Sequence, residues 1–353
     1  MQAIFVGSTG NQPGQTLATW ALVVRLKEKG LKVGFLKPYG LLAGAFSASS
    51  GSSCDPDVFL MRETLGFEEP DGTICPITVS ENLVPEFSGG SCGPLIEKIR
   101  ESFQRVSAGK DVVVIMGAKE IFFGGGLSEL PDSALVKEFD ASVLLVDRYQ
   151  KDPMTLYSFL SLNSFLDGRV KSAIMNHVPP DKVDHVKGKL IPFLQKKGLK
   201  SIVPVPEDLI LAAQTVDSLA GVVGGQIVSC PEKAGNLVAT LTIGSKPLEG
   251  PLAIFKQVYN KIILIELAPG EPREKSVAGI MLTGGKPPSE ILLRVARDRS
   301  IPLILTQADT FQVMETLEKV NPPMGIKDEF RVRRFLRLLD QESDRDRWVE
   351  ALL

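Results

Sequence analysis

The chain has 353 residues, 44% of them hydrophobic, and a formal net charge of −2 at pH 7. Such a hydrophobic content excludes a disordered protein, and a nearly balanced charge leaves no electrostatic footprint for nucleic acid. The length exceeds what one hydrophobic core usually supports, so two domains are expected. No apolar run approaches membrane-spanning length and no charged leader precedes the first strand, so we expect a cytoplasmic protein without a membrane partner.

The four cysteines are far apart and form no C-x-x-C pair, which argues against a zinc site and against disulfides in a reducing compartment. They are Cys54, Cys75, Cys92 and Cys230. Only Cys54, beside Asp55 in a stretch rich in serine and glycine, is a candidate for an exposed, reactive thiol. A plain reduced thiol is the simpler interpretation.

The first elements in the chain are arranged like a phosphate cradle. Residues 4–6 are continuously apolar and predict a buried strand, which Gly7 ends. A glycine-rich loop follows, and residues 15–30 have the apolar spacing, terminal lysines and final glycine of a helix. Loop amides and the positive end of that helix would point at one anion.

This loop departs from the P-loop pattern G-x-x-x-x-G-K-[ST] at two positions. Gly14 and Thr16 are in register, but Thr9 stands at the first glycine and Gln15 replaces the lysine. An amide donates a hydrogen bond but cannot neutralise the charge of a transferring phosphoryl group. We therefore expect Gly10, Gly14, Gln15 and Thr16 to bind a nucleotide or another anion with weakened or absent catalysis. The alternative is an ordinary strand-to-helix turn.

The second predicted strand, residues 32–36, ends at Lys37, which the topology of α/β sheets would bring to the same edge as the loop. There it would replace the missing charge of Gln15, unless it is only a solvated lysine. Asp55 and Asp57 then open a helix over residues 58–65. Both carboxylates are suited to capping that helix and equally to holding Mg²⁺. In the second case, Asp55 and Thr16 would be the metal ligands.

Two further strand ends are expected at the cradle. Residues 111–117 form a buried strand that ends in Met116, where nucleotide enzymes usually keep an acid, and a thioether cannot hold Mg²⁺. Residues 172–175 form a strand that ends in Asn176, which would read a nucleobase edge or cap the turn before Pro179.

Strands and helices continue to alternate through a strand at 142–146, a helix at 153–166, a basic helix at 182–198 and a strand at 201–205. This order predicts an α/β fold with a doubly wound, mostly parallel sheet of the P-loop type. Residues 216–229, with Gly224 and Gly225, would form the closing helix and a joining segment that leads into a smaller α/β unit. That unit would have strands at 237–243, 261–267, 277–282 and 303–306, and helices at 252–258, 290–298 and 310–320.

We therefore expect a P-loop domain over residues 1–215, a second domain over 216–327 and a helical tail over 328–353. In the second domain, Thr283, Gly284 and Gly285 follow a buried strand. They would form either a second small-anion site or, more simply, a tight turn that needs positive backbone φ. The tail carries a helical stripe of apolar residues that should dock on a core or a partner.

Taken together, these motifs resemble one family over essentially the whole chain. It combines a dethiobiotin-synthetase-like P-loop domain with a DRTGG domain, and is similar to the N-terminal regulatory part of long phosphotransacetylases. The resemblance rests on GSTGNQPGQT (7–16), KVGFLKP (32–38), DPDV (55–58), VVVIMG (112–117), VLLVDRYQKD (143–152), AIMNHVPPDKV (173–183), VPVPEDLILAAQTV (203–216) and MLTGG (281–285).

The resemblance implies that Lys37, Thr16 and Asp55 occupy phosphate- or metal-binding positions, while Gln15 and Met116 replace the lysine and the acid that serve phosphates and metal. The DRTGG signature itself falls where this chain reads LAPGEPREKS (267–276), and only Thr283 to Gly285 fit it well. No acyltransferase domain follows, so phosphotransacetylase activity is not expected. The family also implies a homo-oligomer.

Three functions remain as hypotheses. The first is a non-catalytic or weakly catalytic regulatory or sensor protein that binds ATP, another nucleotide or a small anionic metabolite. Its DRTGG domain would meet a protein partner or metabolite, and its family links it to acetyl-phosphate and acetyl-CoA metabolism. The second is an ATP- and Mg²⁺-dependent ligase of the dethiobiotin-synthetase type, made less favourable by the loss of two charged positions. The third is a structural assembly protein with a vestigial P-loop.

Overall fold

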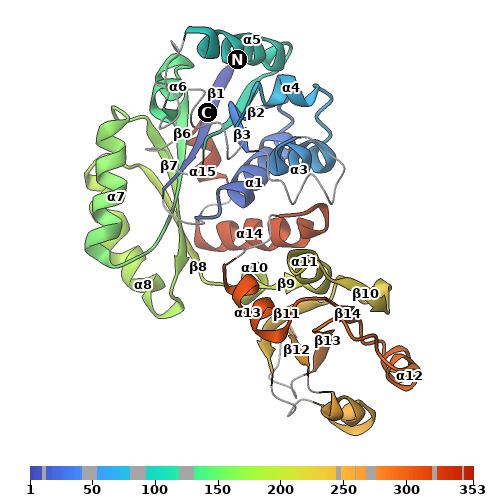
Figure 1. The fold of residues 1–353 in the computed structure, drawn as a ribbon. Helices are drawn as coiled ribbons and strands as arrows, with labels where there is room; N and C mark the ends of the chain where they lie inside the picture. The colour runs from blue at the N-terminus through green and yellow to red at the C-terminus, as the bar shows by residue number, and fades with distance from the viewer. Residues whose placement is uncertain are drawn as a thin grey trace. The chain divides into compact units, whose positions relative to one another are not determined.

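A computed structural model describes residues 1–9, 13–41, 54–79, 93–118, 131–243, 248–258, 260–267, 276–319, 324–343 and 346–353 of the chain. It has two compact units (Figure 1). Unit 1 consists of Met1–Glu207 with Met324–Leu353, and unit 2 of Asp208–Pro323. Among the described residues, no helix combines the length and the apolar character needed to cross a membrane.

Unit 1 is built on a six-stranded sheet in the order β2-β5-β1-β6-β7-β8, and every pairing in it is parallel. The strands are β1 (Gln2–Ser8), β2 (Val33–Leu36), β5 (Val112–Met116), β6 (Ser142–Arg148), β7 (Val170–Val178) and β8 (Ser201–Pro206). The central strands are almost entirely buried, as their continuous apolar runs predict. This confirms the expected doubly wound sheet.

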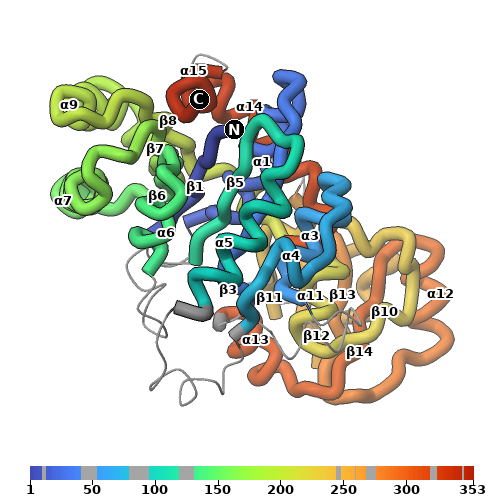
Figure 2. The backbone as a smooth tube through the Cα atoms, turned by 90° about the horizontal axis from the view of Figure 1, so that it is seen from above, coloured from blue at the N-terminus to red at the C-terminus, as the bar shows by residue number. Residues whose placement is uncertain are grey.

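Helices cover both faces of this sheet (Figures 1 and 2). One face packs on a core to which α5, α6, α7 and the helical segment 180–196 contribute. α1, α14 and α15 lie against the other face, where α14 contacts α1 and β8. The helices of unit 1 are α1 (Gln15–Glu28), α3 (Pro56–Leu65), α4 (Asp71–Ile74), α5 (Gly93–Ser107), α6 (Asp132–Glu138), α7 (Asp152–Phe165), α14 (Glu329–Glu342) and α15 (Arg347–Glu350). A small parallel pair, β3 (Tyr39–Leu41) and β4 (Ile77–Val79), completes the unit.

The helix predicted over residues 182–198 is a succession of short helical types. It runs through η1 (Pro180–Lys182), α8 (Val183–His185), a π-helical turn η2 (Val186–Leu190) and α9 (Ile191–Lys196). Pro192, the second residue of α9, lacks the N–H that a regular helix would use at that position, which fits the widened turn just before α9.

Unit 2 contains a second six-stranded sheet, in the order β10-β14-β13-β12-β11-β9. The β13–β14 pairing is parallel and the other four are antiparallel, so the sheet is mixed. Its strands are β9 (Gln214–Thr215), β10 (Gln226–Ser229), β11 (Leu237–Thr242), β12 (Lys261–Glu266), β13 (Val277–Leu282) and β14 (Leu303–Leu305). Its helices are α10 (Leu209–Ala212), α11 (Val216–Val222), η3 (Pro231–Lys233), η4 (Gly250–Gln257), α12 (Glu290–Asp298) and α13 (Thr310–Lys319).

Two predicted segments of unit 2 differ in detail from the structure. Residues 216–229 were expected to hold a closing helix and a joining segment. The helix ends at Val222, near Gly224 with its left-handed φ of 58°, and the rest of the segment includes the strand β10. The helix expected over 252–258 is η4, a 3₁₀ helix that begins at Gly250.

The C-terminal segment packs within unit 1. Phe335, Leu339 and Trp348 from its apolar stripe are fully buried. Arg25 of α1 forms an ion pair with Asp340 of α14, at 2.5 Å.

Candidate functional site

Pro13 and the start of helix α1 lie at the carboxyl ends of β1, β5 and β7, where the sequence predicts a phosphate cradle. Gly14 immediately precedes α1 with a φ of 92°, and α1 has neither a side-chain cap nor an acidic residue in its first turn. Within the part of the chain that the structure describes, no side chain caps the N–H groups of that turn, so they are placed to bind an anion. Gly10, also predicted to bind, lies outside the described residues.

Asn176 holds the loop in place from the end of β7. Its Nδ2 donates to the Pro13 carbonyl at 2.9 Å, and its Oδ1 accepts the His177 N–H at 2.9 Å. A Cβ at Gly14 would lie only 2.7 Å from Asn176 Nδ2, so glycine is needed there for the close approach as well as for its φ. Both of these side-chain hydrogen bonds go to backbone groups, so Asn176 positions Pro13 of the loop next to the end of β7.

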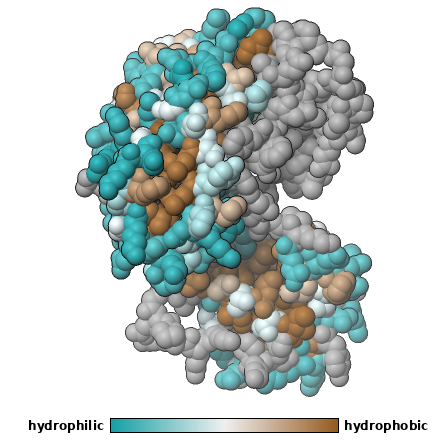
Figure 3. All heavy atoms as spheres, turned by 90° about the vertical axis from the view of Figure 1, so that its left-hand side faces the viewer, coloured by the Kyte–Doolittle hydropathy of each residue, from teal (hydrophilic) through white to brown (hydrophobic). Residues whose placement is uncertain are grey.

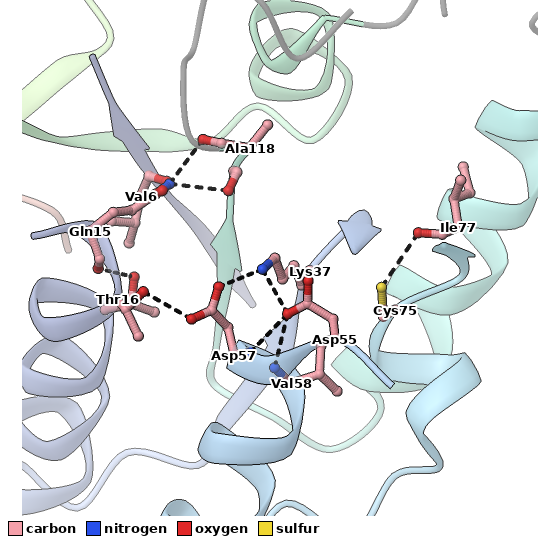
Figure 4. Close-up of polar contacts among 12 residues, drawn as sticks. Val6, Gln15, Thr16, Lys37, Asp55, Asp57, Val58, Cys75, Ile77 and Ala118 are labelled. Atoms are coloured by element: carbon pink, nitrogen blue, oxygen red, sulfur yellow. Dashed lines mark hydrogen bonds and ion pairs between the residues drawn. The ribbon is translucent and has the colours of Figure 1, made fainter. Parts of the chain in front are cut away.

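Gln15, at the place of the P-loop lysine, turns its side chain inward (Figure 4). Nε2 donates to the carbonyls of Val6 at 2.9 Å and Gly117 at 3.1 Å, with a longer contact of 3.3 Å to the Ala118 carbonyl. The residue is only 6% exposed. The amide therefore ties the loop to the ends of β1 and β5 and brings no positive charge to the cradle.

Thr16, Lys37, Asp55 and Asp57 form one connected polar cluster beside Gln15 (Figure 4). Thr16 Oγ1 donates to Asp57 Oδ1 at 2.9 Å. Lys37 Nζ bridges Asp55 Oδ1 at 2.7 Å and Asp57 Oδ2 at 2.5 Å. Asp55 Oδ1 also accepts the N–H groups of Asp57 and Val58, which makes Asp55 the N-cap of α3.

One ammonium faces two carboxylates in this cluster, which leaves one excess negative charge. Burial alone would lower the pKa of Lys37, but the carboxylates of Asp57 and Asp55 outweigh it and hold that pKa above its usual value. Lys37 is thus a charged ammonium between two carboxylates, and its charge is already matched in this arrangement.

The structure brings Thr16 to Asp57 rather than to Asp55, the carboxylate predicted as a metal ligand. Thr16 and Asp57 together offer the hard oxygen atoms that Mg²⁺ prefers near phosphates. Lys37 already supplies a cation to Asp57, so a metal would compete with it. Met116 is buried at the end of β5 and offers no hard ligand. Among the described residues, no group of three or more His, Cys, Asp or Glu side chains is placed to hold a metal.

Asp132, which the sequence analysis missed, is fully buried behind the same strand end. Its Oδ2 accepts the Ala118 N–H at 2.8 Å, and its Oδ1 has no hydrogen-bond partner among the described residues. Burial raises the pKa of Asp132 to about 7. A Cβ at Gly117 would lie 2.5 Å from Asp132 Oδ2. In the sequence, Asp132 is recognisable only as an acidic residue after a proline at the start of a helix, and that pattern does not show that its side chain is buried.

Asp147, at the end of β6, binds the start of the glycine-rich loop. Its buried carboxylate accepts hydrogen bonds from the hydroxyls of Thr9 and Ser158 and from the Arg148 N–H, the last at 2.7 Å. Burial raises the pKa of Asp147 above its ordinary value, and the three hydrogen bonds oppose that rise. Thr9, the residue at the first glycine position of the pattern, therefore has a partner that a glycine would not reach.

The thiols near the cluster are buried. Cys54 is 6% exposed and Cys75 is 5% exposed, so Cys54 is not the accessible thiol that its serine-rich surroundings suggested. Burial, and then the Asp55 carboxylate, raise the pKa of Cys75 to about 12. Cys92 lies outside the described residues.

The second candidate site, in unit 2, has the geometry of a tight turn. Gly284 and Gly285 have φ of 78° and 71°. Their N–H groups donate to the carbonyls of Ala308 at 2.8 Å and Thr306 at 2.9 Å, and the Thr283 hydroxyl pairs with Thr310 at 2.7 Å. Since these amides already have carbonyl partners, the simpler of the two interpretations accounts for the glycines.

Two protein families match this sequence. The AAA domain family matches residues 2–222, more than half of the chain, and the DRTGG domain matches residues 218–320. The phosphate acetyltransferase of Pseudomonas aeruginosa is 22% identical over 95% of this chain and 50% of that protein. The phosphate acetyltransferase of Pseudomonas putida is 24% identical over 94% of this chain and 49% of that protein. These matches confirm the suspected resemblance, and the chain spans about half the length of these curated relatives.

Among solved structures, the septum site-determining protein MinD of Pyrococcus horikoshii, complexed with Mg-ADP, covers 60% of this chain and 83% of its own. The identity is 13% and the TM-score is 0.34, too low for any argument about this site.

Proposed function

Since this chain belongs to the AAA domain family, we propose that it is a non-catalytic or weakly catalytic regulatory protein that binds a nucleotide or another anion at its degenerate P-loop. The loop and the N-terminal turn of α1 supply the backbone donors for the anion. Without a lysine at position 15, the bound anion lacks the charge that phosphoryl transfer would require.

The observation that carries this proposal is the inward orientation of Gln15. Its amide hydrogens are donated to the carbonyls of Val6 and Gly117, so they stabilise the loop instead of facing a phosphate. A neutral amide also cannot offset the charge that develops in phosphoryl transfer, a loss that typically costs on the order of a hundredfold or more in rate. Binding by backbone donors therefore remains while catalysis is weakened.

Lys37 is the residue that would compensate, and its ion pairs with Asp55 and Asp57 argue against full compensation. An anion that recruited Lys37 would leave both carboxylates with less neutralising charge. Because the anion would have to draw Lys37 away from the two carboxylates, its binding should be weak. Weak binding suits a sensor that responds to the concentration of its ligand. A Mg²⁺ ion held by Thr16 and Asp57 would restore the balance, so we propose that Mg²⁺ strengthens nucleotide binding.

We further propose that the ligand or partner belongs to acetyl-phosphate and acetyl-CoA metabolism. This rests on the phosphate acetyltransferases to which the chain is similar over nearly its whole length. The unit with the DRTGG domain would contact a protein partner or metabolite, and the chain would form a homo-oligomer, which sedimentation velocity tests directly.

The experiment is thermal unfolding of the full chain with ATP, ADP or GTP, with and without Mg²⁺, followed by turnover assays. A ligand at a hundred times its dissociation constant adds about 2.7 kcal/mol to stability. We expect a shift with at least one nucleotide, and either no turnover or slow turnover that does not depend on Thr16 and Lys37. Gln15→Lys should tighten nucleotide binding. The control Gln104→Lys adds the same charge at an exposed position of α5 and should not change nucleotide binding.

Two outcomes contradict the proposal. Nucleotide turnover that requires Thr16 and Lys37 would identify an enzyme and favour the ligase hypothesis. If no nucleotide shifts the unfolding temperature of the wild type or of Gln15→Lys, the P-loop is vestigial and binds no nucleotide.

A further inference from the structure

Helix α7 exposes an apolar face that is unusual for the outer side of a surface helix. Met154 is 54% exposed, Tyr157 71% and Phe165 47%. Together with Ser158 and Ser161 they recur at spacings of three and four residues, so they share one face of the helix. The opposite, inward face of α7 carries the buried residues Thr155, Phe159 and Leu162.

Figure 3 faces the side of the molecule that carries α7, and a hydrophobic patch bordered by hydrophilic residues lies on this surface. A cavity of about 390 Å³ opens on the helix here. Its lining consists of Thr9, Gln150, Met154, Tyr157, Ser158, Ser161 and Phe165. This volume falls in the range of small-molecule sites, which are mostly apolar with a few placed polar groups.

The lining specifies the chemistry of a ligand. Two aromatic rings and a thioether offer flat and polarisable contacts, which suit a planar ring. Four hydroxyls, one of them the phenol of Tyr157, and the Gln150 amide offer neutral hydrogen bonds. None of the lining residues among the described part of the chain is charged, so a carboxylate or phosphate entering the cavity would lose its hydration without gaining a counter-charge.

The polar side of the cavity is fixed in position. The hydroxyls of Thr9 and Ser158 both donate to the buried carboxylate of Asp147. Each hydroxyl has then used its hydrogen, so its oxygen lone pairs remain to accept from a ligand. Ligand groups that donate a hydrogen bond, such as an amide or a ring N–H, suit these oxygens.

We propose that this α7 cavity is a second ligand site, separate from the phosphate cradle, for a neutral molecule with a planar aromatic or heteroaromatic ring and a hydrogen-bond donor. Thr9 belongs both to this cavity and to the start of the glycine-rich loop. A ligand that contacts Thr9 therefore touches the first residue of the cradle without occupying its anion position.

The test uses the full chain and ligand-observed NMR titrations with three probes. Nicotinamide and indole are neutral rings with N–H donors, and nicotinate has the nicotinamide ring with a carboxylate. We expect saturable binding of at least one neutral probe and much weaker binding of nicotinate. Ser161→Phe places a ring in the cavity and should weaken binding by about tenfold or more.

The matched control is Ser164→Phe, the same change at an exposed residue of α7 that does not line the cavity. It should leave probe binding unchanged and show that an added phenyl ring on this helix is tolerated. No nucleotide takes part in these measurements, so their outcome is independent of whether the cradle binds one.

Three results would overturn the proposal: no binding of either neutral probe, equal binding of nicotinate, or binding that survives Ser161→Phe. A fourth result would be an oligomer, seen by sedimentation velocity, that Ser161→Phe dissociates and Ser164→Phe does not, in a protein that binds none of the probes. That result would assign the α7 face to a second copy of the chain.

Discussion

Replacing Asp132 by asparagine should change how the stability of unit 1 depends on pH. The Asp132 side chain is fully buried, with one oxygen held by the Ala118 N–H and the other unpartnered. Burial raises its pKa from 3.8 to about 7, so the folded state keeps a proton that the unfolded state releases. The resulting stabilisation is complete below pH 3.8 and is lost as the pH rises through about 7.

The magnitude follows from the two pKa values. Between them, each pH unit removes about 1.4 kcal/mol, which sums to a loss on the order of 4 kcal/mol. Asparagine keeps an oxygen for the Ala118 N–H and carries no charge, so the variant should lack this loss. Relative to the wild type, Asp132→Asn should become progressively more stable as the pH rises from about 4 to about 8.

Urea unfolding followed by tryptophan fluorescence measures this directly. The only two tryptophans, Trp20 and Trp348, are both buried and both in unit 1, so the signal reports that unit. Asp167→Asn, a change at a carboxylate whose side chain is 66% exposed, controls for the loss of one charge. If the wild-type and Asp132→Asn stabilities run parallel between about pH 4 and pH 8, Asp132 is not a buried neutral carboxyl and the prediction is refuted.

Three other changes test the neighbourhood of the site. Lys37→Met should destabilise unit 1 by about 3–5 kcal/mol in urea unfolding, because it strands the two carboxylates that the ammonium bridges, and a variant as stable as wild type would contradict that pairing. Gly117→Ala should cost about 1–3 kcal/mol in the same assay because its Cβ would meet Asp132, while Gly72→Ala, with nothing within 4 Å, should be close to neutral. Cys75 should resist iodoacetamide at pH 8 until the chain unfolds, since its thiol is buried with a pKa of about 12, and rapid native labelling seen by peptide mass spectrometry would refute this.

The order of elements in unit 1 could be read from the sequence because its signals are local. Continuous apolar runs specify strands buried on both faces, and the glycine-rich turn before α1 specifies where an anion site begins. In unit 2 the short elements were less predictable. Residues 216–229 were expected to hold a helix and a joining segment, but the strand β10 that follows α11 after residues 223–225 was not foreseen.

Within the site, the residue types were predictable and their pairings were not. The sequence placed Gln15, Lys37 and Asp55 at the same edge of the sheet because parallel strands end together there. Which carboxylate meets Thr16 depends on the course of α3, since the Asp55 side chain turns back to cap that helix and leaves Asp57 facing Thr16.

The α/β fold class and the absence of a lysine at position 15 could be read from the amino-acid sequence, since both follow from local patterns of residues. The surroundings of the predicted cradle became clear only from the packing of the elements. The burial of Asp132, the Thr9–Asp147 hydrogen bond and the α7 cavity join residues from separate strands and helices. Burial and desolvation depend on how elements pack, and no local pattern encodes the distance between them.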